Sequence, residues 1–328
     1  SLKKCDILSS INIFKNNIFS GCSSLSEILI PKTVTKICAS AFYDCSSLTK
    51  IKIPSSVTFI GEYSFYGCSS LVDITIPSSI KEIKDYLFFG CSSLTHIKIP
   101  SSIVKLGSYA FCNCSSIKQI EIPSSVTQIG EKTFAGCLSI ERIEIPFSIT
   151  KIEDSTFYGC SSLYDIKIPS SVTSIGKYSF SNCTSLKEIN IPSLVTEIKQ
   201  YAFSHCSKIV QISLPPSVTT IDHSTFFGCT SLNQIIIPSS VTSIKDFAFC
   251  KCSALEQITI PDSVISIGSY TFNECSSLKK ISIPSSVTKI GDFAFNECYL
   301  LNQISIPSSI DSIGFNAFNG CPLDLKTL

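Results

Sequence analysis

The segment "IPSSVTSIGKYSFSNCTSL", residues 168–186, decides the fold because its parts recur along the chain. The hexapeptide IPSSVT occurs at 53–58, 122–127, 168–173, 237–242 and 283–288. Three residue types also recur every 23 residues in a common register: cysteine from Cys22 to Cys321, proline from Pro31 to Pro307 and phenylalanine from Phe19 to Phe318. A constant period of this length is typical of a solenoid in which each repeat forms one coil.

The repeat unit reads C-S-S-L-x-x-I-x-I-P-S-S-V-T-x-I-G-x-Y-A-F-x-G. Thirteen full units occupy residues 22–320, residues 1–21 fit a truncated first repeat, and residues 321–328 form a C-terminal end that loses the pattern. No linker or charge block interrupts the series, so we expect a single domain over residues 1–328. Because the chain begins within a repeat, we expect it to be a processed or trimmed part of a longer protein.

One unit predicts the structure of a coil. Leu186, Ile189 and Ile191 form a short alternating pattern that predicts a strand, which can bury its apolar face only by pairing in parallel with copies of itself. Pro192 ends the strand because proline has no N–H group to donate. The serines that follow suit a turn, and Val195 and the next isoleucine return the chain to the core as a possible second short strand.

The end of each unit predicts a helical turn. Seven units have glycine after the second strand, and an acid often follows, where it suits the start of a helical turn. The small residue and the phenylalanine that close the unit, such as Ala202 and Phe203, should face inward. The acids are Glu62, Asp85, Glu131, Asp154, Asp246 and Asp292.

The repeat resembles the leucine-rich repeats of the BspA-like type, of the 23-residue class, over residues 2–321. This resemblance implies a right-handed superhelix with a parallel β-sheet on the concave face and short strands or helical turns on the convex side. Family members occur in surface proteins of anaerobic bacteria and parasitic protists and are implicated in attachment to host matrix or to cells. The resemblance is specific for the fold and much less so for the function.

Cysteine usage indicates thiols with a packing role. Stacked coils bring equivalent cysteines close enough for a disulfide, but pairing would break the coil symmetry, so we expect buried thiols that act as small apolar side chains. A linear series of thiols does not offer the tetrahedral set that zinc needs, so no metal site is expected. Cys112 and Cys250 lie off the series and should point away from the core. We expect nearly all 18 cysteines to be reduced.

Composition and motifs argue against several classes of function. The net charge is +1, and Arg142 is the one arginine among 26 basic residues, which disfavours nucleic-acid binding. No apolar run reaches the ~18 residues of a membrane span. Asp73, His96 and Thr75 form a trio that suggests a hydrolase, but no oxyanion hole is evident, so no catalytic site is expected. No phosphate loop or dinucleotide motif occurs, and we expect no cofactor.

The variable positions on the strands are the candidate binding surface. Two residues flank the middle isoleucine and should face outward on the concave surface; they are charged with mixed sign up to Glu188 and mostly Gln, Ser and Thr beyond it. These charges could simply pair across strands, or they could bind a protein partner. The candidate residues are Glu27, Lys50, Lys52, Asp73, His96, Lys98, Glu121, Arg142, Glu144, Asp165, Lys167 and Glu188.

A cluster of Tyr43, Tyr66 and Phe89 is a second candidate surface, although rings at these positions could instead shield the core. Together these features predict a non-enzymatic protein-binding solenoid. The resemblance favours a cell-surface or secreted adhesion protein whose partner is a protein of the host matrix or of a cell surface. The alternative is a cytoplasmic scaffold for protein–protein interaction, which the many free thiols favour.

Overall fold

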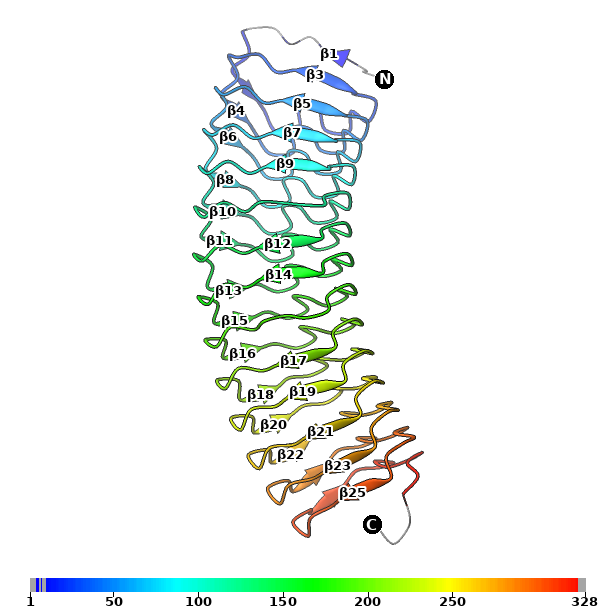
Figure 1. Ribbon diagram of the computed structural model, residues 1–328. Helices are drawn as coiled ribbons and strands as arrows, with labels where there is room; N and C mark the ends of the chain where they lie inside the picture. The colour runs from blue at the N-terminus through cyan, green and yellow to red at the C-terminus, as the bar shows by residue number, and fades with distance from the viewer. Residues whose placement is uncertain (1–3, 6, 8–9, 324–328) are drawn as a thin grey trace. The chain divides into compact units, whose positions relative to one another are not determined.

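The computed structural model describes residues 4–5, 7 and 10–323 (Figure 1). The chain packs as two compact units. Unit 1 comprises Ser1–Ile149 and Ser155–Pro169, and unit 2 comprises Thr150–Asp154 and Ser170–Leu328. The expected single domain over residues 1–328 stays a prediction. The predicted chain ends at residues 1–3 and 324–328 lie outside the described residues.

Unit 1 consists of coils that carry two kinds of short parallel strand. The first kind forms the sheets β1-β3-β5-β7-β9 and β12-β14, from β1 (Lys4–Cys5), β3 (Glu27–Leu29), β5 (Lys50–Lys52), β7 (Asp73–Thr75), β9 (His96–Lys98), β12 (Arg142–Glu144) and β14 (Asp165–Lys167). The second kind forms the sheets β2-β4-β6 and β8-β10-β11, from β2 (Ile13–Phe14), β4 (Lys36–Ile37), β6 (Phe59–Ile60), β8 (Glu82–Ile83), β10 (Lys105–Leu106) and β11 (Gln128–Ile129).

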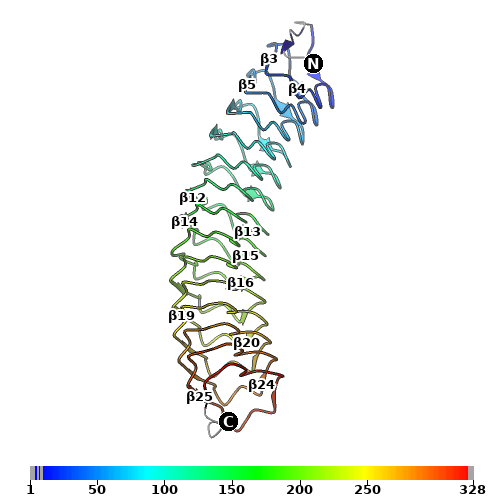
Figure 2. The same cartoon turned by 90° about the vertical axis from the view of Figure 1, so that its right-hand side faces the viewer.

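Unit 2 repeats this arrangement. Its three-residue strands are β17 (Gln211–Ser213), β19 (Gln234–Ile236), β21 (Gln257–Thr259), β23 (Lys280–Ser282) and β25 (Gln303–Ser305). Its two-residue strands are β13 (Lys151–Ile152), β15 (Ser174–Ile175), β16 (Glu197–Ile198), β18 (Thr220–Ile221), β20 (Ser243–Ile244), β22 (Ser266–Ile267), β24 (Lys289–Ile290) and β26 (Ser312–Ile313). Figure 2 shows β19 and β25 on one side of the coils and β20 and β24 on the other.

The strand register confirms the 23-residue period. Lys50 pairs with Asp73 and Ile51 with Ile74, so identical positions of neighbouring coils lie opposite each other. In these strands the middle isoleucine is buried and the two flanking residues are exposed. The parallel strands therefore form as the alternating pattern predicts, and the expected second short strand is present as well.

The recurrent IPSSVT phrase is explained by hydrogen bonds between coils. In the turn after the proline, the Val57 N–H donates to the Pro54 carbonyl at 3.0 Å. The second serine then donates its hydroxyl to the carbonyl of the valine position in the preceding coil: Ser56 Oγ lies 2.8 Å from the Val34 oxygen. This bond recurs in most coils, for example from Ser102 and Ser240, and it satisfies one backbone carbonyl of the neighbouring coil each time, which explains why serine is common at this position. Leu194 is an exception.

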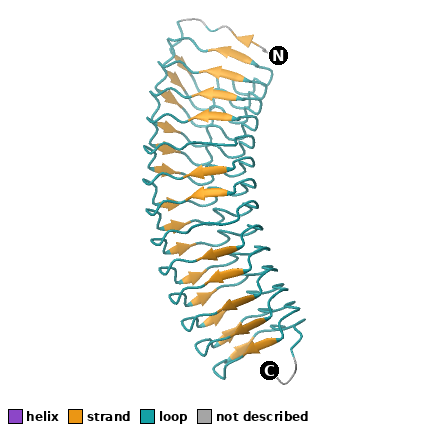
Figure 3. Cartoon of the chain, in the orientation of Figure 1, coloured by secondary structure: helices purple, strands orange, loops and turns teal. Residues whose placement is uncertain are grey.

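The predicted helical turns are wrong: the described part of the chain contains no helix, and the segments between strands are turns (Figure 3). Each coil holds two residues with positive φ in this region, for example Tyr63 at 58° and Gly67 at 68°. A right-handed helix cannot continue through such residues. The backbone donates instead to the next coil, as from Phe65 N–H to the Leu87 carbonyl at 3.0 Å.

The glycine and the acid before this segment also have roles between coils. A Cβ added to Gly107 would come within 2.6 Å of the backbone of Lys84 and Asp85, so the close approach of neighbouring coils favours glycine there. The Asp85 carboxylate accepts the N–H of Ser108, its next-coil equivalent, at 2.9 Å. Asp154, Asp246 and Asp292 accept the equivalent N–H in the same way, so these aspartates cap the next coil and do not start a helix.

The core of each unit is a stack of phenylalanine rings, one from each coil. In unit 1, consecutive rings from Phe42 to Phe157 have centroids 5.4–5.7 Å apart, and in unit 2 the rings from Phe180 to Phe318 are 5.2–5.8 Å apart. The valine, leucine and isoleucine positions of the repeat surround this stack and are buried in most coils.

Candidate functional site

The exposed residues of the three-residue strands form what we call the sheet face. Ten of the twelve predicted binding residues lie on these strands in unit 1, where all are exposed except Asp165, which is half-buried. Glu121 is also exposed in unit 1 but lies outside the strands, at the equivalent position of its coil. Glu188 is exposed in unit 2, in a segment outside the strands. The sheet face of unit 2 carries polar side chains such as Gln211, Gln234 and Gln257. The predicted inside–outside assignment of these positions is confirmed.

The parallel register arranges the charges of unit 1 in two rows. One row runs through Glu27, Lys50, Asp73 and His96, and the other through Leu29, Lys52, Thr75 and Lys98. Neighbouring members of a row belong to adjacent strands, ~4.8 Å apart. Charges of both signs are thus held at fixed spacing by a backbone that does not depend on them.

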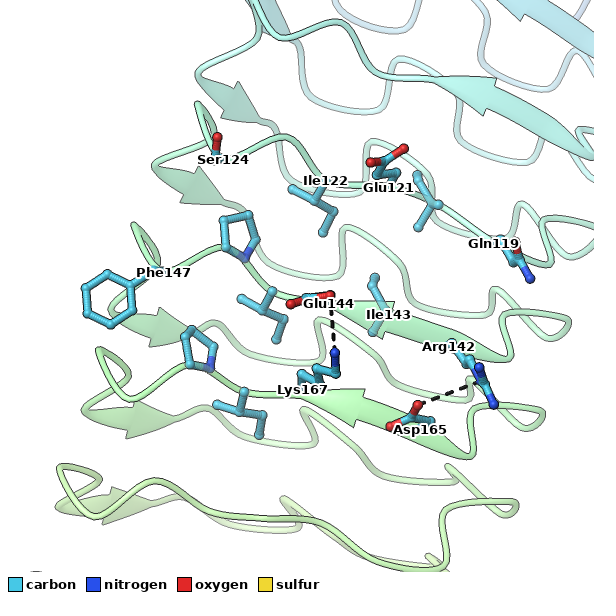
Figure 4. A pocket seen from close by; sticks show the side chains of 15 residues that line it. Gln119, Glu121, Ile122, Ser124, Arg142, Ile143, Glu144, Phe147, Asp165 and Lys167 are labelled. Carbon is cyan, nitrogen blue, oxygen red and sulfur yellow. Dashed lines mark ion pairs between the residues drawn. The ribbon is translucent and has the colours of Figure 1, made fainter.

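Part of the sheet face pairs with itself, as one of the two alternatives from the sequence predicts. Arg142 Nε lies 3.7 Å from Asp165 Oδ2, and Lys167 Nζ lies 3.6 Å from Glu144 Oε2 (Figure 4). These side chains are about half exposed or more, so each pair contributes only ~0–1 kcal/mol. Such weak pairs can exchange for contacts with a partner.

Three lysines of the same face are different. Within the described ranges, the side chains of Lys50, Lys52 and Lys98 make no ion pair with any residue. Glu121 also lacks an ion pair there and separates Lys98 from Glu144. The basic residues of β5 and β9 are therefore available to a partner, whereas those of β12 and β14 are already compensated.

A shallow groove of about 910 Å³ runs over the self-paired part of the face. The two ion pairs lie within it, and the Phe147 ring stands at its rim (Figure 4). Phe147 is 71% exposed, and it is not among the residues predicted from the sequence. A signal was present: no other full repeat has an aromatic residue directly after the proline, where serine is usual.

A second groove, of about 730 Å³, contains Asp73, Thr75 and His96. His96 Nδ1 lies 3.0 Å from the hydroxyl of its neighbour Thr95. Neither an ion pair nor a hydrogen bond joins His96 to Asp73 in the part of the chain that the structure describes. The geometry of an acid–histidine–hydroxyl triad is therefore not present in this trio.

The second candidate cluster is a stack of half-buried rings. The ring centroids of Tyr43 and Tyr66 are 4.7 Å apart, and those of Tyr66 and Phe89 are 4.6 Å apart, with nearly parallel planes. Burial raises the pKa of the Tyr66 hydroxyl. Since neighbouring rings cover each other's faces, the cluster presents mainly ring edges to solvent. It offers a partner less aromatic surface than its composition suggests.

The cysteines of the repeat act as hydrogen-bond donors as well as apolar side chains. Cys68 Sγ lies 3.2 Å from the Phe42 carbonyl, and Cys229 Sγ lies 3.2 Å from that of Phe203. Burial raises the pKa of the Cys160 thiol and of the Cys229 thiol to about 12, so both remain protonated and unreactive at neutral pH. The cysteines from Cys22 to Cys321 form no disulfide.

The expected outward orientation of Cys112 and Cys250 is wrong, since they are only 7% and 2% exposed. Cys112 occupies the position that Phe89 holds one coil earlier, where a small side chain has little surface to expose. Cys250 accepts a hydrogen bond from Asn273 Nδ2 at 3.5 Å. Among the described residues no cluster of three or more His, Cys, Asp or Glu side chains could hold a metal ion.

Comparison with known families and structures gives one consistent result. The family described as "BspA type Leucine rich repeat region (6 copies)" matches residues 1–117, 81–210 and 196–324. A comparison with curated protein sequences found no match. Within the described residues, no helix is long and apolar enough to cross a membrane.

Several solved bacterial structures are similar. A leucine-rich repeat protein from Bacteroides ovatus is 35% identical, with a TM-score of 0.77, and the match covers 88% of this chain and 80% of that one. A leucine-rich cell-surface protein from Faecalibacterium prausnitzii is 29% identical over 84% of each chain, with a TM-score of 0.49. A leucine-rich repeat protein from Eubacterium ventriosum is 23% identical, with a TM-score of 0.58, over 98% of this chain and 83% of that one.

Proposed function

The chain belongs to the BspA-type leucine-rich repeat family, and from this premise we propose that it binds a protein partner through the sheet face of unit 1. Leucine-rich repeat proteins are typically non-enzymatic binding scaffolds, which supports a binding function. The observation that carries the proposal is the contrast on one scaffold: an irregular pattern of charges in unit 1 against a nearly uniform polar surface in unit 2.

An irregular pattern can encode a partner because charges of both signs fix the register of an interface and exclude wrong partners. The grooves of about 910 and 730 Å³ on this face add shape to the charge pattern. The buried core does not contribute, because its side chains and thiols are out of reach of a partner.

We further propose that the partner is a protein of the host matrix or of a cell surface, and that the chain acts in adhesion outside the cell. The family membership supports this location, as do the attachment roles that the sequence resemblance implies. The alternative is a scaffold inside the cell, and the free thiols of the described cysteines favour it.

The test measures binding of the purified chain to a panel of extracellular matrix proteins and to proteins from a cell lysate. For a partner found there, reversal of Lys98, Arg142 and Lys167 together to Glu should weaken binding tenfold or more, ~1.4 kcal/mol. The matched control replaces Gln211, Gln234 and Gln257 with Ala, which should change affinity little.

Both triple variants should keep the fold, because all six side chains are exposed. Circular dichroism and thermal unfolding would verify this. A partner that loses affinity through the glutamine changes, and not through the charge reversals, would refute the proposal and point to unit 2 instead. A partner found only in lysate would favour the intracellular alternative.

A further inference from the structure

We propose that the partner segment bound by the sheet face is an acidic, extended stretch of protein whose carboxylates meet Lys50, Lys52 and Lys98 and whose adjoining apolar side chain rests on Phe147. This inference rests on the proposed function and specifies the chemistry of its partner. It uses only residues of unit 1.

The charge argument begins with the lysines. Lys50 and Lys52 are alternate residues of β5 and point to the same side of the sheet, and Lys98 lies two strands further along the row of Lys52. All three are exposed and have no ion pair with any described residue. Asp73 lies among them and Glu27 lies beside Lys50 on β3, so the patch carries a net charge of 3 − 2 = +1 when histidine is left out of the count. An acidic segment complements this patch, whereas a basic one is repelled.

The same row limits where the acidic part can lie. Beyond Lys98 come Glu121 and Glu144, and Glu144 is compensated by Lys167 at 3.6 Å. Glu121 has no such partner in the described part of the chain and repels a further carboxylate. The bound segment must therefore lose its negative charge at this coil, which fixes both its register and its direction along the row.

Phe147 determines the chemistry of the segment beside the acidic part. Its ring is 71% exposed at the rim of the larger groove, just past the end of β12. An exposed ring that replaces the usual serine buries apolar surface only when a partner covers it. The strand β5 and the coil of Phe147 are four coils apart, ~19 Å at ~4.8 Å per step. A fully extended segment of about six residues spans this distance at ~3.3 Å per residue.

The experiment selects binders without assuming a partner. A phage library of random 12-residue peptides is selected on the purified chain, and enriched peptides are synthesised and measured by fluorescence anisotropy. We expect enriched peptides to contain two or more acids followed or preceded by an apolar residue. The double variant Lys52→Glu with Lys98→Glu should weaken them at least tenfold, and Phe147→Ser several-fold. The control, Lys280→Glu with Lys289→Glu in unit 2, should have no effect.

Each other outcome contradicts the inference in a distinguishable way. Enriched peptides without acids that respond to reversal of Arg142 and Lys167 would refute the acidic segment and leave the proposed function intact. Peptides insensitive to every change on the sheet face would contradict both. A selection that enriches no peptide would overturn the docking of an extended segment, while the panel of whole proteins would still decide the proposed function.

Discussion

Removal of one ring from the phenylalanine stack should be among the most destabilising single changes in the chain. Phe226 is fully buried between Phe203, at 5.8 Å, and Phe249, at 5.5 Å, with interplanar angles of 4° and 9°. Replacement of Phe226 by Ala removes the ring from the core and both ring contacts, and it leaves a cavity. Changes of this kind cost ~3–5 kcal/mol of unfolding free energy.

The structure places the expected cost toward the upper end of that range. The neighbouring rings belong to coils whose backbones are fixed by hydrogen bonds, from the Phe203 N–H to Thr225 at 3.0 Å and from the Phe226 N–H to Ala248 at 2.9 Å. These coils cannot approach each other to fill the gap, because the spacing of parallel strands is set by the backbone. A cavity that cannot collapse retains its full penalty.

The measurement is guanidinium unfolding of purified wild type and variant, followed by circular dichroism and by tyrosine fluorescence, since the chain has no tryptophan. Gln234→Ala is the matched control in the same unit, because Gln234 is exposed on β19 and should cost under ~1 kcal/mol. Comparable losses from the two variants, or a loss under ~1 kcal/mol from Phe226→Ala, would show that the inside and outside positions are assigned in the wrong register.

Two further predictions concern the buried polar atoms. The Ser179 hydroxyl is buried without a hydrogen-bond partner among the described residues, so Ser179→Ala should be neutral or raise the unfolding free energy by up to ~1 kcal/mol. Ser64→Ala at the equivalent position should lower the unfolding free energy by ~1–2 kcal/mol, because the Ser64 hydroxyl donates to the Gly61 carbonyl at 2.7 Å. Denaturant unfolding measures both variants, and equal changes in unfolding free energy for Ser179→Ala and Ser64→Ala would contradict this reasoning. For the thiols, burial raises the pKa of Cys229 from 9.0 to about 12. The contribution of this thiol to the unfolding free energy is therefore intact below pH 9. It falls by ~1.4 kcal/mol per pH unit between pH 9 and 12, because the thiol ionises in the unfolded chain there and stays protonated in the folded one. Between pH 9 and 11 the unfolding free energy should fall less steeply for Cys229→Ala than for the wild type, by ~1.4 kcal/mol per pH unit, which corresponds to one proton. Equal slopes for the two proteins would refute the assignment.

The repeat positions were predictable because they follow simple rules. The alternation around Ile51 and Ile74 places the charged neighbours outside, and the proline ends each strand, as the structure has it. The binding surface could be proposed for the same reason: outward residues are the ones that vary. The periodic pattern therefore predicts the strands, the buried core and the exposed sheet face together.

Other features depend on contacts between coils, which no single repeat reveals. The acid at Asp85 is compatible with the start of a helix, but it accepts the Ser108 N–H one coil later. Cys250 resembles an outward residue from its position beside Cys252, yet Asn273 of the next coil covers it. Phe147 was not predicted because a pattern of repeated residues conceals the one residue that departs from it.

The constant offset of the hydrogen bonds between coils has a consequence for the evolution of such chains. Serine hydroxyls bond carbonyls 22 residues earlier and cysteine thiols bond carbonyls 26 residues earlier, so in the described part of the chain these bonds join neighbouring coils. Duplication or loss of 23 residues therefore leaves each remaining hydrogen bond between coils with an equivalent partner. Loss of a single residue instead shifts the donors of one coil out of register with the carbonyls of the next. Gene segments that encode whole coils can recombine unequally without harm to folding, and a lineage can gain or lose binding surface in steps of one coil.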